Sequence, residues 1–278
     1  MGVSQNTISP EQLKARIGAA NCPLIVDVRR EQVYAEATDL IPTARWRDHR
    51  ASDHWARELA PGRDVVVYCV HGHQVSQAAC ALLAAAGVKA RYLEGGIEGY
   101  RDAGGITVAK TKWTPADRPS RWVTRERPKI DRIACPWFIR RFVDRDAAIY
   151  YVAPDQVKAA AVELGAVPFD IPDPDIEFSH VGELCSFDAF LDKFQVRDPA
   201  LDQLAVIIRG ADTARLDMAP QCAGLLAVSL GLSASCADDA EMLEHGILVY
   251  DALYGWCRHA QGETHNWPTA KKDKAYGG

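Results

Sequence analysis

The stretch that most constrains the fold of this chain is a short apolar run followed by a cysteine, a loop and a helix-forming segment. The run is residues 65–68, the cysteine is Cys69, the loop reaches Ser76, and residues 77–86 are rich in alanine and leucine. This order predicts a buried β-strand, a loop and an α-helix. Backbone N–H groups at the helix start favour negative charge, so we expect a stabilised thiolate and a nucleophile at Cys69.

A free cysteine more often packs as a small hydrophobe, and Cys22 and Cys80 fit that alternative. Cys69 differs, because two histidines and a glycine crowd a loop that has no core to fill. Imidazole N–H groups can bind an anion, whereas a metal site made from this loop would lack a fourth ligand. We expect substrate contacts from the whole loop: Val70, His71, Gly72, His73, Gln74, Val75 and Ser76.

The neighbouring segments add three short strands. Residues 24–29 predict a strand that ends in a charged turn, residues 41–45 a short edge, and residues 91–96 a strand that closes on paired glycines. With the Cys69 loop, the Asp27-Val28-Arg29 start and the Leu93-Glu94-Gly95-Gly96 ending, this order resembles the rhodanese (sulfurtransferase) family.

The resemblance implies a doubly wound parallel α/β sheet over residues 1–112. It implies that Cys69 accepts a sulfane sulfur from a small donor such as thiosulfate, forms a persulfide, and passes the sulfur to a thiol or oxyanion acceptor. The positions of Asp27 and Arg29 predict structural roles for both residues. Compared with short single-domain rhodaneses, the active loop carries one more residue, which predicts a wider cradle.

A longer loop is similar to that of arsenate reductases and dual-specificity phosphatases, which hold a tetrahedral oxyanion. Those enzymes use an arginine in the loop. Here His71, His73 and Gln74 stand instead, which argues against phosphatase chemistry.

Length and composition predict about two globular domains in 278 residues. A net charge of −5 without a basic stripe argues against a nucleic-acid partner. Eight cysteines without pairing spacing and a polar start without a signal peptide predict a cytoplasmic protein. The uncharged residues 218–237 are too polar for a membrane span and predict a buried helix around Leu225, Leu226, Val228 and Leu230.

Residues 113–126 predict a linker that docks onto a domain surface through Trp113 and Trp122, since tryptophan is costly to leave in water. The second domain then covers residues 127–278. Its pattern predicts helices over 135–143 and 154–164, a strand at 149–152, an irregular acidic segment at 169–178, and mostly helices over 186–257. The second domain is therefore expected to be mostly α, in an α+β arrangement.

Three dense blocks of this half, DRIACPWFIRRF at 131–142, EFSHVGELCSFD at 177–188 and RGADT at 209–213, resemble the C-terminal domain of the chromate-resistance B family. The resemblance covers about residues 127–260 and implies a link to chromate or related oxyanion stress. No catalytic role is carried over with it. In the regulator branch of that family a separate N-terminal region contributes to DNA control, and here a rhodanese-like domain occupies its place.

Carboxylates, an imidazole and a thiol lie within sixteen residues of the second domain, where Pro172 and Pro174 disfavour a helix. This mixture suits a divalent transition metal, the only cofactor that the sequence indicates. The alternatives are a solvated acidic loop, or ion pairs between these acids and Arg132 or Arg209. The predicted ligands are His180, Glu177, Glu183, Cys185 and His245.

Two functions follow from these patterns. The first is a cytoplasmic sulfurtransferase with Cys69 as nucleophile. The alternative is a redox or oxyanion sensor with a reactive thiol and a metal- or oxyanion-binding second domain.

Overall fold

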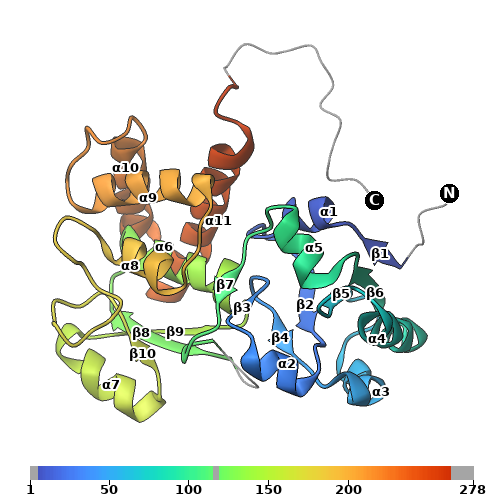
Figure 1. The fold of residues 1–278 in the computed structure, drawn as a ribbon. Helices are drawn as coiled ribbons and strands as arrows, with labels where there is room; N and C mark the ends of the chain where they lie inside the picture. Colours follow the sequence, from blue (N-terminus) through green and yellow to red (C-terminus); the bar gives the residue numbers. More distant parts are fainter. Residues whose placement is uncertain (1–5, 115–118, 264–278) are drawn as a thin grey trace.

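The structure is a computed structural model that describes residues 6–114 and 119–263. Two domains lie side by side, the N-terminal one drawn in blue to teal and the C-terminal one in green to red (Figure 1).

The first domain contains a parallel sheet whose described strands run in the order β1-β6-β5-β2-β4. Two further strands, β3 (Asp39–Leu40) and β7 (Val108–Ala109), pair antiparallel in a separate small sheet. The strands of the main sheet are β1 (Thr7–Ile8), β2 (Leu24–Asp27), β4 (Arg45–Trp46), β5 (Asp64–Tyr68) and β6 (Lys89–Leu93).

Helices cover both faces of this sheet, as the doubly wound prediction requires. Along β5, Val65 and Val67 pack in one cluster with α4, whereas Val66 and Tyr68 pack in another with α1 and α5. This alternation follows from the two-residue period of a strand. The helices are α1 (Pro10–Lys14), α2 (Glu31–Glu36), α3 (Ser52–Trp55), α4 (Gln74–Ala85) and α5 (Gly96–Asp102), with short 3₁₀ turns at His49–Ala51 and Ala56–Glu58.

The second domain begins with two β–α units on a small parallel sheet of order β10-β8-β9. Helix α7 covers one face and the remaining helices cover the other (Figure 1). Its strands are β8 (Arg121–Arg125), β9 (Ala148–Val152) and β10 (Val167–Pro168). Its helices are α6 (Asp131–Phe138) with a π-helical turn at Ile139–Val143, α7 (Val157–Leu164) after a 3₁₀ turn at Pro154–Gln156, α8 (Ser186–Lys193), α9 (Pro199–Asp212), α10 (Cys222–Ser235) and α11 (Asp239–His259).

Aromatic side chains form the centre of the second domain. The Trp122 ring lies 5.3 Å from Phe178 and 5.4 Å from Phe190, measured between centroids. Trp113 contacts the same group edge-on, 4.7 Å from Phe178, so the predicted docking of this tryptophan is confirmed. The apolar cluster runs on into the first domain through Tyr68 and Tyr100 and joins the two domains into one core.

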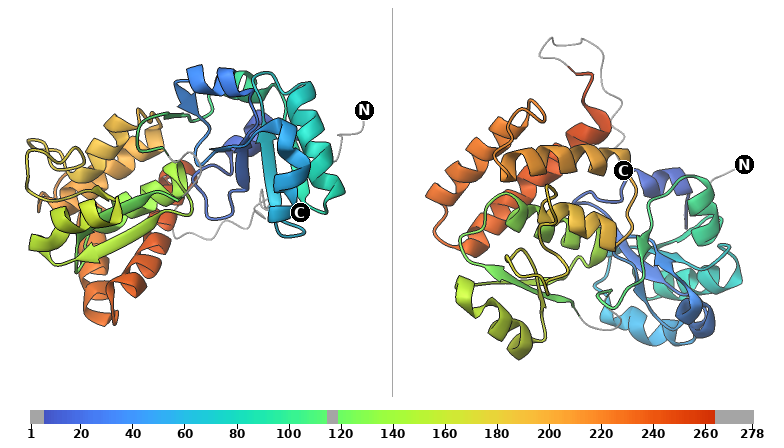
Figure 2. Two further views of the ribbon diagram at one scale, coloured as in Figure 1. Left: turned by 90° about the horizontal axis from the view of Figure 1, so that it is seen from below. Right: turned by 60° about the vertical axis from the view of Figure 1, so that its left-hand side comes forward.

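Polar contacts tie the two domains together as well. The Thr43 N–H donates to the Phe142 carbonyl at 3.0 Å, and Arg45 pairs with the buried Asp144 at 2.7 Å. Arg258 at the end of α11 donates to the carbonyls of Lys14 and Ile17 at 2.9 and 3.0 Å. Both views in Figure 2 show α11 reaching the first domain beside α1.

The predicted linker differs from the structure. Residues 121–125, assigned to the linker, form β8, the central strand of the second sheet. The surrounding prolines and charged residues favoured a linker, although Trp122, Val123 and Thr124 have high β-propensity. The last part of the predicted second domain, residues 264–278, lies outside the described residues.

The helix predicted to be buried, α10, is only partly so. Leu225 is buried, but Val228 and Leu230 are almost half exposed, because the helix packs through a narrow stripe of Cys222, Leu225 and Ser229. No helix in the described part of the chain is long and apolar enough to cross a membrane.

Replacing Trp122 by alanine should lower the free energy of unfolding by about 3–5 kcal/mol, because a fully buried ring leaves a cavity at the centre of the aromatic core. Chemical denaturation measures this. Val162→Ala is the control, since Val162 is 85% exposed and its truncation should change stability by less than about 0.5 kcal/mol. Equal losses in the two variants would contradict the assignment of Trp122 to the core.

Candidate functional site

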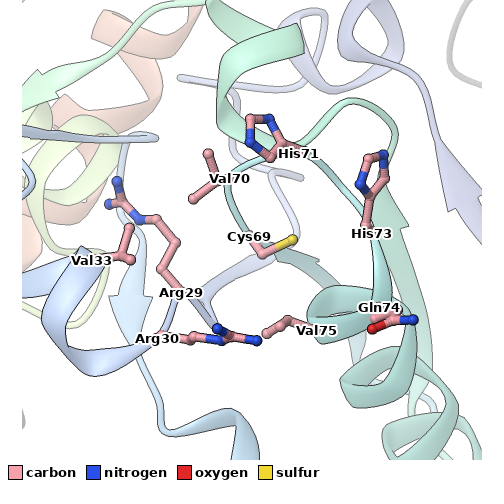
Figure 3. Close-up of a pocket in the computed structure, with 9 residues that line it drawn as sticks. All are labelled: Arg29, Arg30, Val33, Cys69, Val70, His71, His73, Gln74 and Val75. Atoms are coloured by element: carbon pink, nitrogen blue, oxygen red, sulfur yellow. The ribbon is translucent and has the colours of Figure 1, made fainter.

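Cys69 is the first residue after β5 and lies at a cavity of about 560 Å³ (Figure 3). Only 7% of the residue is exposed, so the thiol is reached through the cavity and not from the open surface. The cavity is lined by Arg29, Arg30, Val33, Cys69, Val70, His71, His73, Gln74 and Val75.

Helix α4 begins at Gln74, three residues earlier than its sequence predicts. Gln74, Val75 and Ser76 are thus the first helical turn, and the loop proper is residues 69–73. The first N–H groups of a helix have no partner within it, so these residues take helical geometry without losing their capacity to bind an anion. The wider cradle expected from the extra residue stays a prediction.

The loop is held by the start of α5. The Ile97 N–H donates to the Cys69 carbonyl at 3.0 Å, and the Glu98 N–H donates to the Val70 carbonyl at 3.2 Å. The Cys69 and Val70 carbonyls are thus bound on the side of α5, which leaves the N–H groups of the loop for the side away from α5. Within the described residues, none of the N–H groups of residues 70–76 has a protein acceptor.

Two glycines make this close approach feasible. Gly96 has φ +61°, and an added Cβ would lie 2.3 Å from the Val70 carbonyl oxygen and 2.5 Å from that of Cys69. Gly72 has φ +71°, and its Cβ would lie 2.5 Å from the Leu93 carbonyl oxygen. Side chains are excluded at both positions by sterics as well as by the left-handed backbone. Gly72, predicted to contact substrate, is not among the residues that line the cavity.

Ser76 lies beneath the thiol and not on the cavity wall. Its residue is fully buried, its Oγ lies 3.2 Å from Cys69 Sγ, and the hydroxyl donates to the His73 carbonyl at 3.1 Å. With its single proton the hydroxyl can donate to the sulfur in place of that carbonyl, which would support a thiolate or a bound persulfide. The other predicted contact residues, Val70, His71, His73, Gln74 and Val75, line the cavity.

The two histidines stand at the cavity rim, above Cys69 in Figure 3. Their ring centroids are 5.9 Å apart, and His71 Nδ1 lies 2.9 Å from the Glu98 carboxylate. Among the described residues, the group with ligand atoms close enough for a metal ion lies in the second domain and includes neither histidine.

Two arginines border the cavity and differ in role. Arg29 is buried and bidentate to Asp27, with Nε 2.8 Å from Oδ2, and Tyr68 donates to the same carboxylate at 2.8 Å. Its guanidinium turns away from the thiol (Figure 3), consistent with a structural role. Arg30 is exposed, at the N-cap of α2, and its guanidinium extends toward Val75. No acidic side chain among the described residues pairs with it.

A second group of polar side chains lies in the other domain, and we call it the acid–histidine cluster. His180 Nε2 lies 3.2 Å from Asp131, 3.3 Å from Asp212 and 3.4 Å from Asp170, each distance measured to a carboxylate oxygen. The cluster lies at the carboxyl ends of β8 and β10, beside the start of α6.

The charges of this cluster shift one another's ionisation. Hydrogen bonds to Asp131 and Asp170 raise the pKa of His180 to about 10. Burial and the neighbouring charges of Asp131 and Asp170 raise the pKa of Asp212 to about 7, and burial also raises the pKa of Asp131. For Asp170 burial acts in the same direction, but hydrogen bonds from His180, Ser186 and Arg125 outweigh it and lower the pKa.

The other predicted metal ligands do not meet His180. Glu177 pairs with Lys112 at 2.6 Å, and Glu183 pairs with Arg215 at 3.0 Å. Cys185 is buried at the start of α8, where burial raises the pKa of its thiol, and His245 lies on α11, 3.6 Å from the Cys236 sulfur. The ligand set predicted from sequence is therefore wrong except for His180, because proximity along a loop does not bring side chains to one point.

The predicted arginine pairs are found in part. Arg132 Nε lies 3.3 Å from Asp170, an acid of the predicted segment. Arg209 pairs with Asp188 of α8 at 2.6 Å.

Family models match both halves of the chain. The model described as Rhodanese-like domain matches residues 9–103, and the model described as ChrB, C-terminal domain matches residues 122–257. The chain joins a rhodanese-like domain to a ChrB C-terminal domain. Protein ChrB of Cupriavidus metallidurans is 30% identical over 134 residues, which are 48% of this chain and 39% of ChrB.

Solved structures resemble the rhodanese-like domain. A rhodanese-related protein of Thermoplasma volcanium is 23% identical and covers 37% of this chain and 97% of its own, with a TM-score of 0.33. A thiosulfate sulfurtransferase of Pseudomonas aeruginosa is 24% identical and covers 37% of this chain and 19% of its own, with a TM-score of 0.30. The assignment of the domain rests on the family model and on the parallel sheet flanked by helices.

Sequence reasoning missed Arg30 in the rhodanese-like domain and Asp131 and Asp212 in the ChrB C-terminal domain. Arg30 directly follows the Asp-Val-Arg run and was available as a signal, because ligands of open parallel sheets bind outside the carboxyl ends of the strands. Asp131 and Asp212 lie in the dense blocks at 131–142 and 209–213, but only the fold shows that these blocks meet at residue 180.

Replacing Gly96 by alanine should displace the Cys69 loop and reduce its reactivity, because the new methyl group collides with two loop carbonyls. The alkylation rate of Cys69 by iodoacetamide, followed by mass spectrometry, measures this. Gly87→Ala is the matched control. Gly87 has φ +83° with open space around its Cβ position, so it carries the same backbone cost of about 1–2 kcal/mol without a collision. Equal alkylation rates in both variants would refute the role of Gly96.

Proposed function

We propose that this protein is a rhodanese-type sulfurtransferase with Cys69 as its nucleophile. The observation that carries the proposal is the Cys69 thiol at the entry to α4, at a cavity bordered by unpaired N–H groups and the Arg30 guanidinium. Such a site favours an anionic sulfur on the protein and an anionic donor in the cavity.

The first half-reaction takes a sulfane sulfur from a donor such as thiosulfate. The Cys69 thiolate attacks the terminal sulfur, a bond forms between the two sulfur atoms, and the bond from that sulfur to the sulfonate breaks. Sulfite leaves with the bonding electron pair, and Cys69 keeps the transferred sulfur as a persulfide. A nucleophilic acceptor, a thiolate or cyanide, then attacks the outer sulfur and restores the Cys69 thiolate.

The negative charges of donor and persulfide define the roles of the surrounding groups. The N–H groups of residues 70–76 have no protein acceptor among the described residues, and N–H groups at a helix start can bind the negative charge of the added sulfur. Ser76 can donate to the sulfur from below. Arg30 supplies a full positive charge at the cavity, where it can hold the sulfonate group through a planar pair of N–H donors.

The ChrB C-terminal domain supports a link to chromate or related oxyanion stress. It also favours a second candidate function, a sensor in which Cys69 is modified by an oxidant and the second domain responds. Turnover separates the two functions. An enzyme releases many equivalents of sulfite per chain in the presence of thiosulfate and cyanide, whereas a sensor gives one modification per chain.

Cys69→Ser should abolish both the persulfide and thiosulfate:cyanide sulfurtransfer, because serine cannot carry the sulfane sulfur. Mass spectrometry after thiosulfate treatment should show one added sulfur in the wild type, on the peptide that contains Cys69. Cys236→Ser is the control, since Cys236 is far from this cavity, and it should keep full activity. Full sulfurtransfer by the Cys69 variant would refute the nucleophile.

Arg30→Gln should raise the KM for thiosulfate roughly tenfold or more, because it removes a charge-assisted hydrogen bond to the donor. Alkylation of Cys69 by the neutral reagent iodoacetamide should change little. Arg50→Gln is the charge-matched control, since Arg50 pairs with Asp48 and does not line the cavity. Equal KM values for the two variants would remove Arg30 from the donor site.

A further inference from the structure

The acid–histidine cluster of the second domain has the geometry of a cation site. The ligand atoms of Asp131, Asp170 and His180 all lie within 4.8 Å of one another, and Asp212 faces the same imidazole nitrogen. The two aspartates of this trio are almost completely buried, with 2% and 3% exposure. Several carboxylates gathered out of water need a positive charge among them.

The distances around His180 are compatible with coordination of an ion as well as with hydrogen bonding. One N–H group can point at one acceptor, yet three carboxylate oxygens lie at nearly the same distance from Nε2, 3.2 to 3.4 Å. In a tetrahedral site with metal–ligand bonds of about 2.0–2.1 Å, neighbouring ligand atoms are separated by about 3.3–3.5 Å. An ion among these atoms would satisfy all three contacts at once.

Ion-pair and hydrogen-bond partners orient the carboxylates of Asp131 and Asp170. The Asp170 Oδ2 oxygen receives Arg125 at 3.0 Å, with Arg132 at 3.3 Å, so Oδ1 is the oxygen that faces His180. Ser186 donates through its Oγ to Asp170 at 2.7 Å and through its backbone N–H to Asp131 at 3.2 Å. Ligating carboxylates in metal sites are oriented by outer hydrogen bonds of this kind.

The position of the cluster in the fold suits a ligand site. It lies outside the carboxyl ends of β8 and β10, beside the start of α6, where open parallel sheets bind their ligands. His180 is 42% exposed, so an ion can enter on its side.

The ligand chemistry selects the kind of ion. Three carboxylates repel an oxyanion, which excludes chromate itself as the occupant. An imidazole together with carboxylate oxygens suits a divalent transition metal better than magnesium or calcium, which prefer oxygen ligands alone. We propose that one divalent first-row transition-metal ion binds this cluster through His180, Asp131 and Asp170, with Asp212 beside the imidazole. The site is separate from Cys69 and goes beyond the proposed sulfur transfer.

The test is a Co²⁺ titration of the full chain, prepared without a polyhistidine tag and freed of metal with a chelator. We expect about one equivalent of Co²⁺, seen as visible absorption bands, displacement by Zn²⁺, and a higher melting temperature in the presence of metal. His180→Ala and Asp131→Asn should each weaken Co²⁺ binding by at least about tenfold. Melting curves without metal establish that each variant is folded, and His180→Gln replaces a variant that is not.

Two matched controls locate the ion. His245→Ala removes an imidazole beside a cysteine outside the cluster, and Cys69→Ser removes the reactive thiol. Both should bind Co²⁺ as the wild type does. The proposal is overturned if the wild type does not bind, if binding persists unchanged in folded His180 and Asp131 variants, or if either control variant loses it.

Discussion

Both candidate sites depend on one property of parallel β–α units. The carboxyl end of each strand meets the amino end of the following helix at the same edge of the sheet, where the first helical N–H groups have no partner. Cys69 lies between β5 and α4, and Asp131 begins α6 after β8. The position of chemistry in each domain follows from this geometry, and the side chains at the edge decide what can bind.

The two edges carry opposite charge. At Cys69 the cavity has unpaired N–H groups, two imidazoles and the Arg30 guanidinium, which together favour an anion. At His180 three carboxylates converge, and arginines lie behind one of them, which favours a cation. The proposed sulfur donor and the proposed metal ion would therefore bind at separate places without competition between them.

The shared hydrophobic core supports the backbone at both sheet edges. Ile130, directly before Asp131, has φ +40°, a strained conformation for a β-branched residue. Its N–H donates to the Ser229 Oγ at 3.2 Å, and its carbonyl accepts from the Tyr250 hydroxyl at 2.7 Å. Helices α10 and α11 thus hold the backbone that presents Asp131. The same core reaches the first domain, whose loop is fixed separately by the start of α5.

Local patterns in the sequence determined the strand–loop–helix around Cys69 and the helical character of the second domain, since each depends on residues close in the chain. The resemblance to the rhodanese family implied the doubly wound first sheet, and the cost of leaving tryptophan in water predicted the docking of Trp113. The local patterns misplaced β8 within a linker, because its neighbours are charged and proline-rich. Only the tertiary structure decided that Arg30 stands at the Cys69 cavity and that Asp131, Asp170 and Asp212 meet at His180. Those residues are brought together by strand order and helix packing, which a linear pattern does not encode, because a contact between distant segments depends on how the whole core closes.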